Sequence, residues 1–146
     1  MDRILFYRTG DPYGEFSNFA AFPIAVDGDV WPTSEHYFQA QKFARQEDQD
    51  EIRRQKSPMK AARMGRERNR PLRNDWEQIK DDVMLRALRA KFTQHATLRQ
   101  RLIETGEAEI VEHTENDRYW ADGGDGAGLN RLGKLLMQLR EEFRRK

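Results

Sequence analysis

The segment at positions 31–43, Trp-Pro-Thr-Ser-Glu-His-Tyr-Phe-Gln-Ala-Gln-Lys-Phe, constrains the fold most, because a helix start is followed by apolar side chains on most sides. Pro32 does not fit inside a strand, and Thr33 or Ser34 is a good N-cap residue. Glu35 then falls in the first helical turn, where unpaired N–H groups and the helix dipole favour an anion. A helix with apolar groups nearly all round is usually buried.

One narrow polar stripe interrupts this apolar pattern. At about 100° per residue, Glu35, Gln39 and Lys42 align on one face of the predicted helix, with Phe38 beside them and Tyr37 on the opposite side. Two interpretations stay open at this point. The stripe is either a solvated surface seam with a helix-capping glutamate, or the lining of an internal cleft in which Glu35 has a chemical role.

Length and composition limit the class of protein. The 146 residues suffice for one hydrophobic core, so we expect a single domain over 1–146. Charged residues make up 35% of the chain but balance to a net charge of +1, which argues against bulk electrostatic binding of nucleic acid. The absence of cysteine excludes disulfides and fits a reducing compartment. With no signal-like or membrane-spanning run in the sequence, we expect a cytoplasmic protein without a membrane partner.

The first quarter of the chain is predicted to be rich in strands. Positions 4–7 form a short β-prone run, and positions 23–31 contain a central Asp-Gly pair that is typical of a β-hairpin. The segment 16–19 between them is too polar at its centre for a core strand and too aromatic for an ordinary loop. Asn18 either makes a local turn hydrogen bond or, with Phe19 beside it, is held against a ligand.

The chain is strongly basic between positions 53 and 73. A short helix is predicted over 57–65, and Lys60, Arg63 and Arg66 lie near its end and the following loop. These side chains can grip one phosphate. Alternatively, most of them form a solvated basic face that is offset by the acidic residues preceding it.

A long core helix is predicted to follow a cap at Asn74 or Asp75. Trp76 and Lys80 lie four residues apart near its start. They either offer a ring and an ammonium group to one cleft, or are a core tryptophan beside a surface lysine. A further helix at about 97–105 and an edge strand at 109–113 complete this part of the chain.

A glycine-rich loop at positions 114–130 opens the final predicted helix. Its glycines permit positive φ angles and close backbone approach to a ligand. It lacks both the Gly-Lys-Ser/Thr signature and the Gly-x-Gly-x-x-Gly spacing, so it is a weak phosphate-loop signal. Its distinctive feature is the interleaving of Asp117 and Asp122 with Trp120, which suits a sugar or a planar base.

The available side chains narrow the chemistry. His36, His95 and His113 have no metal-ligand spacing, so we expect no metal and no cofactor. A Gly-x-Ser-x-Gly elbow does not occur in the sequence. Carboxylates beside aromatic rings remain, and these suit hydrolysis of a glycosidic bond through an oxocarbenium-like transition state.

Two motifs together resemble the YbiA-like N-glycosidases of the NADAR family. The first is the segment 31–43, and the second runs from Glu112 to Trp120, followed by Asp122-Gly-Gly and Gly-x-Asn130-Arg-Leu-Gly. The resemblance extends over nearly the whole chain. It implies a helix-rich α+β domain of the YbiA-like class with a small antiparallel strand component.

The resemblance also implies an activity. Family members cleave the N-glycosidic bond of early ribosylamino-pyrimidine phosphates of riboflavin synthesis, giving ribose 5-phosphate and an aminopyrimidine, so the expected partner is a small phosphoribosyl substrate. Two alternatives stay open. One is an ADP-ribosyl glycohydrolase, for which nucleic acid would be a partner, and the other is a binding module for a phosphoribosyl metabolite without catalytic activity.

Both lines of reasoning favour Glu35 as the catalytic residue, with Asp122 or Asp117 as its partner carboxylate. The family usually has glycine where this chain has Ala121, and a positive φ there would strain the backbone and misdirect Asp122. The candidate substrate-binding residues are Asn18, Phe19, Trp31, Lys42, Arg63, Arg66, Trp76, Lys80, Trp120 and Asn130.

Overall fold

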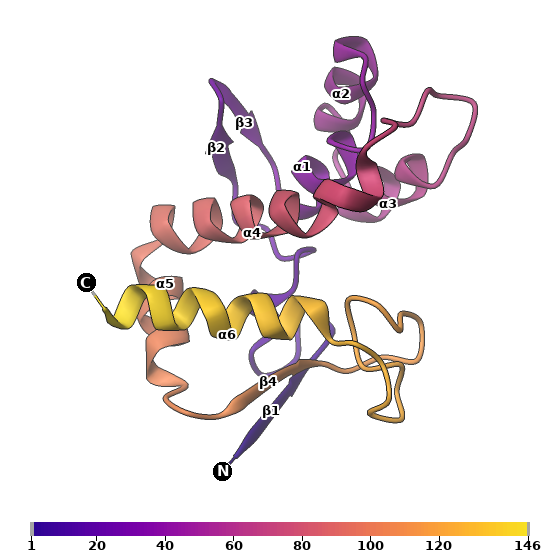
Figure 1. The fold of residues 1–146 in the computed structure, drawn as a ribbon. Helices are drawn as coiled ribbons and strands as arrows, with labels where there is room; N and C mark the ends of the chain where they lie inside the picture. Colours follow the sequence, from indigo (N-terminus) through magenta and orange to yellow (C-terminus); the bar gives the residue numbers. More distant parts are fainter. Residues whose placement is uncertain (1, 146) are drawn as a thin grey trace. The chain divides into compact units, whose positions relative to one another are not determined.

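The computed structural model describes residues 2–145, and among these it contains six α-helices, one short 3-10 helix and four strands (Figure 1). The chain divides into two units. One combines the described parts of Met1–Ala20 and His95–Lys146, and the other is Ala21–Gln94. Each is described by itself below, and the single domain expected over 1–146 stays a prediction.

The Ala21–Gln94 unit contains a β-hairpin and four helices. The strands are β2 (Ile24–Val26) and β3 (Asp29–Trp31), paired antiparallel. The hairpin turn has positive φ angles at both central residues, 53° at Asp27 and 88° at Gly28, as a type I′ turn requires. The helices are α1 (Ser34–Ala40), α2 (Gln46–Arg53), α3 (Pro58–Gly65) and α4 (Trp76–Gln94).

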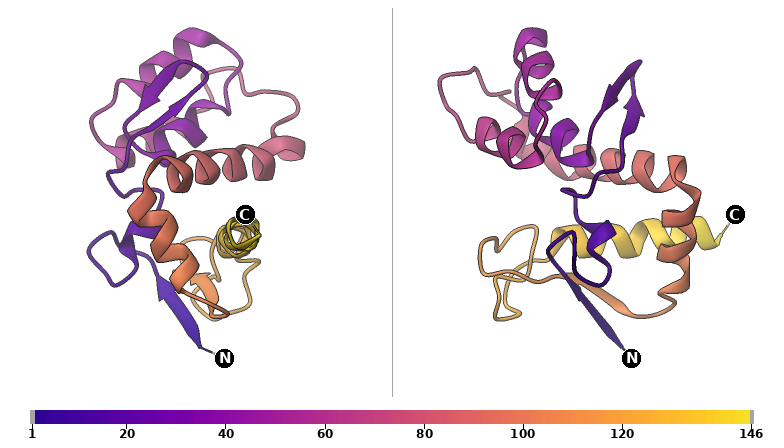
Figure 2. Two further views of the ribbon diagram at one scale, coloured as in Figure 1. Left: turned by 90° about the vertical axis from the view of Figure 1, so that its left-hand side faces the viewer. Right: turned by 180° about the vertical axis from the view of Figure 1, so that it is seen from behind.

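Side-chain caps fix two of these helix starts. Thr33 accepts a hydrogen bond from His36 N at the start of α1, and Ser57 accepts from Met59 N and Lys60 N at the start of α3, where Pro58 occupies the first position. Every residue of α1 is buried. Helix α4 contacts α1 and strand β2, and the hairpin projects away from the axis of α4 (Figure 2).

The core of this unit lies on the face of α1 that carries Tyr37 and Ala40. Its buried members are Ile24, Trp31, Tyr37, Ala40, Phe43, Ile52, Ala61, Met64 and Ala87. The core therefore uses the side of α1 opposite to the polar stripe, as the helical spacing predicts.

The other unit is built on the strand pair β1 (Arg3–Phe6) and β4 (Glu109–Glu112). It also contains the 3-10 helix η1 (Gly14–Phe16) and helices α5 (Ala96–Glu104) and α6 (Arg131–Arg144). Helix α6 packs on β4 and buries its apolar ladder, Leu132, Leu135, Leu136 and Leu139.

The fold class is α+β, as predicted. The hairpin is antiparallel as expected, whereas β1 and β4 pair in parallel, with Arg3 opposite Glu109 and Phe6 opposite Glu112. A parallel pair needs a long crossover connection, and the chain between Phe6 and Glu109 supplies one. No helix within residues 2–145 is both long and apolar enough to cross a membrane.

Candidate functional site

The predicted polar stripe of α1 is the starting point of the candidate site. Glu35 and Gln39 are 8% and 7% exposed, so the stripe is no solvated seam at these two positions. One helical turn separates them, and Gln39 Nε2 donates a hydrogen bond of 2.7 Å to Glu35 Oε2. The buried carboxylate thus has a fixed orientation.

Gln39 reaches this position because helix α3 contributes a glycine where the two helices meet. A Cβ atom on Gly65 would overlap Gln39 Oε1. Among residues 2–145 no donor lies within hydrogen-bond distance of this Oε1 atom. The sequence indicates only that a helix ends at Gly65. The packing of α3 on α1 shows in addition that the missing side chain of Gly65 leaves room for Gln39.

Lys42 lies one turn beyond Gln39. Its Nζ donates to Gly65 O at 3.4 Å and lies 5.8 Å from the centre of the Phe38 ring. Burial lowers the pKa of Lys42 to about 8, the Glu35 charge raises it, and the charges of Arg68, Arg66 and Lys80 lower it further. Lys42 is therefore protonated in most molecules at neutral pH and sensitive to any added anion.

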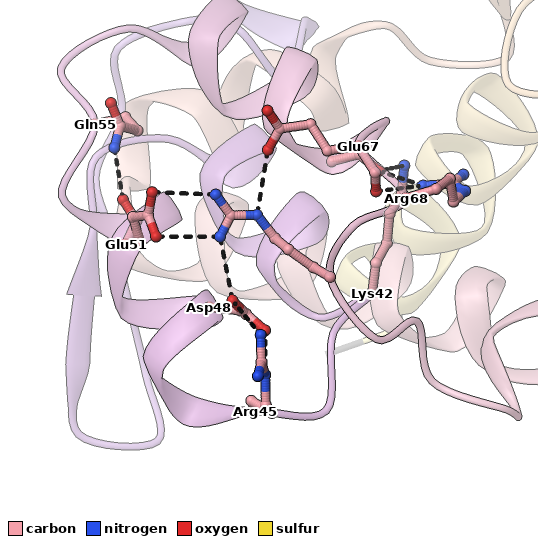
Figure 3. Close-up of polar contacts among 9 residues, drawn as sticks. Lys42, Arg45, Asp48, Glu51, Gln55, Glu67 and Arg68 are labelled. Carbon is pink, nitrogen blue, oxygen red and sulfur yellow. Dashed lines mark hydrogen bonds and ion pairs between the residues drawn. The ribbon is translucent and has the colours of Figure 1, made fainter.

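The structure brings four basic side chains near one another, and we call them the cation cluster: Lys42, Arg66, Arg68 and Lys80. Arg68 Nη1 donates to Gly65 O at 3.1 Å, the same carbonyl that Lys42 approaches (Figure 3). The sequence analysis did not select Arg68, because nothing distinguished it within a run of arginines. The predicted ligand Arg63 is an exposed side chain of α3, and its role stays a prediction.

Two of the predicted aromatic residues take different places around α1. Trp76 opens α4 and packs against Phe38 with ring centroids 5.2 Å apart, so it belongs with the Glu35 stripe. Trp31 packs edge-on against Tyr37, with ring centroids 5.4 Å apart. The guanidinium carbon of Arg53 lies over the Trp31 ring, 5.9 Å from its centroid. Trp31 therefore lies on the core side of α1, apart from the stripe.

Asp122 lies in the glycine-rich loop of the other unit. Its Oδ2 is 2.7 Å from His113 Nδ1, and its Oδ1 accepts from Gly124 N at 2.8 Å and from Thr114 N at 3.2 Å. Burial alone raises the pKa of Asp122, but the hydrogen bonds from His113, Gly124 and Thr114 outweigh it and lower the pKa below its usual value. The carboxylate thus holds the start and the middle of the loop together.

The side chain of Asp117 binds the backbone of this loop, and that of Asn130 binds the backbone of strand β4. Asp117 Oδ1 accepts from Tyr119 N and Trp120 N at 2.9 and 2.8 Å. Asn130, with φ of 50°, accepts from Glu112 N through Oδ1 and donates to Ile110 O through Nδ2. Its side chain therefore extends the hydrogen bonding of strand β4.

The remaining predicted ligands of this unit are Trp120, Asn18 and Phe19. Trp120 packs edge-on against Tyr119 at 4.8 Å. Asn18 is buried, 6% exposed, and Phe19 is half-buried with its N–H donating to Ser17 Oγ. Their roles as ligands stay predictions.

Ala121 causes no backbone strain. Within residues 2–145, positive φ angles occur in this loop at Gly123, Gly124, Gly126 and Asn130, and Ala121 is not among the positive-φ residues. It is fully buried. The methyl group is thus accommodated, and the doubt it raised about Asp122 is removed. Across the same part of the chain, no three His, Asp or Glu side chains group in a way that could hold a metal ion.

Comparison with known proteins gives one consistent result. The profile of the NADAR domain matches residues 5–144. N-glycosidase YbiA of Escherichia coli (strain K12) is 66% identical over 140 residues, covering 96% of this chain and 88% of the relative. N-glycosidase Npun_R5314 of Nostoc punctiforme is 43% identical over 144 residues, covering 97% of this chain and 92% of the relative.

A solved structure is similar over almost the same length. The NMR structure of the E. coli protein YbiA has a TM-score of 0.91 and 64% sequence identity, and the match covers 98% of this chain and 85% of that one. Riboflavin biosynthesis protein VVA0006 of Vibrio vulnificus is 42% identical over 140 residues, covering 96% of this chain but 38% of the relative.

Proposed function

This chain belongs to the NADAR family, and we propose that, as an N-glycosidase of that family, it hydrolyses ribosylamino-pyrimidine phosphates of early riboflavin synthesis to ribose 5-phosphate and an aminopyrimidine. One observation carries the proposal: a buried, oriented carboxylate, a pair of aromatic rings and four cations gather around α1. The name of the Vibrio relative, a riboflavin biosynthesis protein, supports the substrate class.

Glu35 is the proposed catalytic group. Cleavage of an N-glycosidic bond develops positive charge at C1′ of the ribose, and a fixed carboxylate stabilises that charge or orients the attacking water. Gln39 donates a hydrogen bond to the Glu35 carboxylate, and the charge of Lys42 lies near it. Phe38 and Trp76 supply apolar ring surface beside it.

The cation cluster is the proposed phosphate-binding site. The charges of Arg66, Arg68 and Lys80 act on Lys42, and an anion bound among these side chains relieves that repulsion. Of the predicted phosphate ligands Lys60, Arg63 and Arg66, this assignment keeps Arg66. It brings in Lys42 and Lys80, which the sequence analysis named as substrate-binding residues, and adds Arg68. Arg63, an exposed residue of α3, stays a predicted ligand.

Asp122 and Asp117 stay the candidate partner carboxylates. Their oxygens already accept several backbone and side-chain hydrogen bonds within the loop. We infer that they act chiefly by shaping the loop that carries Trp120.

The test measures release of ribose 5-phosphate from freshly made aminopyrimidine ribosylamine phosphate, corrected for spontaneous hydrolysis. Glu35→Gln keeps the side-chain shape and removes the charge, and we expect kcat to fall on the order of 100-fold with little change in KM. Near wild-type turnover by folded Glu35→Gln would contradict the catalytic role. Turnover that requires an adenylate group would favour an ADP-ribosyl glycohydrolase, and stoichiometric binding without turnover would favour a binding module.

A further inference from the structure

Two members of the cation cluster lie on an irregular segment rather than on a helix. Arg66 and Arg68 belong to residues 66–73, which we call the basic loop, between the end of α3 and the start of α4. Both side chains are exposed. Their positions relative to Lys42 therefore depend on how the loop is attached to its surroundings.

The basic loop is tied at its start to the end of α3 and at its end to the segment that follows α1. Arg68 Nη1 donates to Gly65 O near the start. At the end, Leu72 pairs with Phe43 in an isolated β-bridge and Arg73 N donates to Lys42 O at 2.8 Å. A side-chain hydrogen bond near its start and backbone contacts at its end thus hold the loop in place.

Arg70 attaches the middle of the loop to α2. Its Nη1 donates to Asp48 Oδ1 and Glu51 Oε2 at 3.1 Å each, its Nη2 donates to Glu51 Oε1 at 3.1 Å, and its Nε donates to Glu67 Oε1 at 3.2 Å. Figure 3 shows the three carboxylates converging from α2 and from the loop, with Arg45 on the far side of Asp48.

This ion network is largely shielded from water at its centre. The Arg70 side chain is 13% exposed and that of Asp48 is 5% exposed. A bidentate guanidinium in such a setting makes stronger and more directional contacts than a surface ion pair. Because Nε, Nη1 and Nη2 all donate to carboxylates, Arg70 itself is not suited to binding a further anion.

We propose that Arg70 is a positioning residue for anion binding, which ties the basic loop to α2 and thereby sets where Arg66 and Arg68 lie relative to Lys42. The identity of the anion as a substrate phosphate rests on the proposed function. Without Arg70, Glu67 would face Asp48 and Glu51 with no cation shared among the three. Repulsion would then move the loop away from α2 and disperse the cation cluster.

The experiment compares two substitutions that remove the same charge from the same loop. Arg73 pairs with Asp75 at 3.1 Å, and the two side chains are 35% and 51% exposed, so Arg73→Gln is the matched control for Arg70→Gln. The probe is inorganic phosphate, titrated calorimetrically into the full chain at neutral pH and low salt. We expect Arg70→Gln to raise the Kd roughly 3- to 30-fold, the range for residues that act through others, and Arg73→Gln to change it less than about 2-fold.

A double-mutant cycle separates positioning from general loss of stability. In an Arg66→Gln/Arg68→Gln background, Arg70→Gln should weaken phosphate binding no further, because the groups it positions are gone. An equal loss in both backgrounds, unchanged phosphate affinity in folded Arg70→Gln, or no phosphate binding by the unmodified chain would each overturn the proposal.

A milder variant keeps the test decisive if Arg70→Gln does not fold. Glu51→Gln removes one of the three carboxylates, whose side chain is 48% exposed, and leaves Arg70 in place. It should give a smaller increase in Kd that also vanishes in the Arg66→Gln/Arg68→Gln background. Phosphate binding does not require turnover, so a positive cycle in a chain without glycosidase activity would refute the proposed function alone.

Discussion

Gln39 Oε1 occupies the place in which a Cβ atom of Gly65 would lie. The side-chain amide of Gln39 therefore lies between α3 and Glu35, and its nitrogen is 2.7 Å from the Glu35 carboxylate. The absence of a side chain on α3 thus determines how the carboxylate on α1 is oriented. A glycine that looks like a helix end in the sequence becomes part of the site in the fold.

Gly65→Ala should therefore lower kcat by roughly 10-fold, because the new methyl group must displace Gln39 from Glu35. Alanine is the better helix former by about 1 kcal/mol. A loss of stability in Gly65→Ala, which we expect at about 1–3 kcal/mol, is therefore caused by the overlap of the new methyl group with Gln39. The measurements are kcat and the free energy of unfolding in urea.

Gly10→Ala is the control for this variant, since nothing lies within 4 Å of a Cβ built there. Adding Gln39→Ala to Gly65→Ala should restore stability without restoring kcat. A Gly65→Ala enzyme with unchanged kcat would show that the orientation of Gln39 does not matter for turnover.

Anion binding should weaken as the pH rises through about 8. The pKa of Lys42 is lowered to about 8, mainly by burial, so its charge is present below that pH and lost above it. Sulfate is the appropriate probe, because its own charge stays constant over this range. We expect the Kd for sulfate to rise several-fold between about pH 7 and pH 9.

Lys42→Met should bind sulfate weakly and with a flat pH profile, whereas Lys80→Met should bind weakly but keep the dependence near pH 8. A steep profile that persists in Lys42→Met would assign the titration to another group.

His36 should make stability depend on pH in mildly acidic solution. The ring is fully buried, with Nε2 2.9 Å from Gln55 O and Nδ1 2.8 Å from Thr33 Oγ1. A carbonyl only accepts, so Nε2 carries the proton and Nδ1 accepts from the Thr33 hydroxyl. Burial lowers the pKa of His36, although the hydrogen bond to Gln55 raises it in part.

The sign follows from proton linkage. Below pH 6.5 the unfolded chain binds a proton at His36, whereas the folded chain does not bind it until the pH nears its lower folded-state pKa. The free energy of unfolding is therefore highest above pH 6.5 and falls as the pH drops toward the folded-state pKa. Urea unfolding between about pH 7 and pH 5 should show this fall, and His36→Gln should flatten it relative to a His95→Gln control. Parallel profiles for His36→Gln and the unmodified chain would contradict the assignment.

The sequence predicted the local elements well because capping and hairpin signals act over a few residues. Thr33, Ser57 and the Asp27-Gly28 turn lie where those signals placed them. The parallel pairing of β1 with β4 and the contact of Gly65 with Gln39 depend on tertiary packing, which leaves no local pattern. Arg68 and Arg70 differ in role only through their three-dimensional partners, so a run of arginines could not separate them.

The last prediction compares the two loop carboxylates. Asp117 uses one oxygen to accept from two backbone N–H groups, and the Oδ1 atom of an asparagine can accept both. Asp122 uses Oδ1 for two backbone N–H groups and Oδ2 for His113 Nδ1. In Asp122→Asn the new NH₂ group would face the ring nitrogen of His113, so the histidine must change its tautomer or move. We therefore expect Asp122→Asn to lower kcat/KM by about 10-fold or more and Asp117→Asn by less than about 3-fold.

His113→Ala separates two explanations for such a loss, because it leaves the Asp122 charge but removes its contact with the histidine ring. Similar losses in His113→Ala and Asp122→Asn would show that Asp122 positions the loop, whereas a loss confined to Asp122→Asn would give the Asp122 carboxylate a role in turnover of its own. A larger loss in Asp117→Asn than in Asp122→Asn would contradict the ranking derived from these hydrogen bonds.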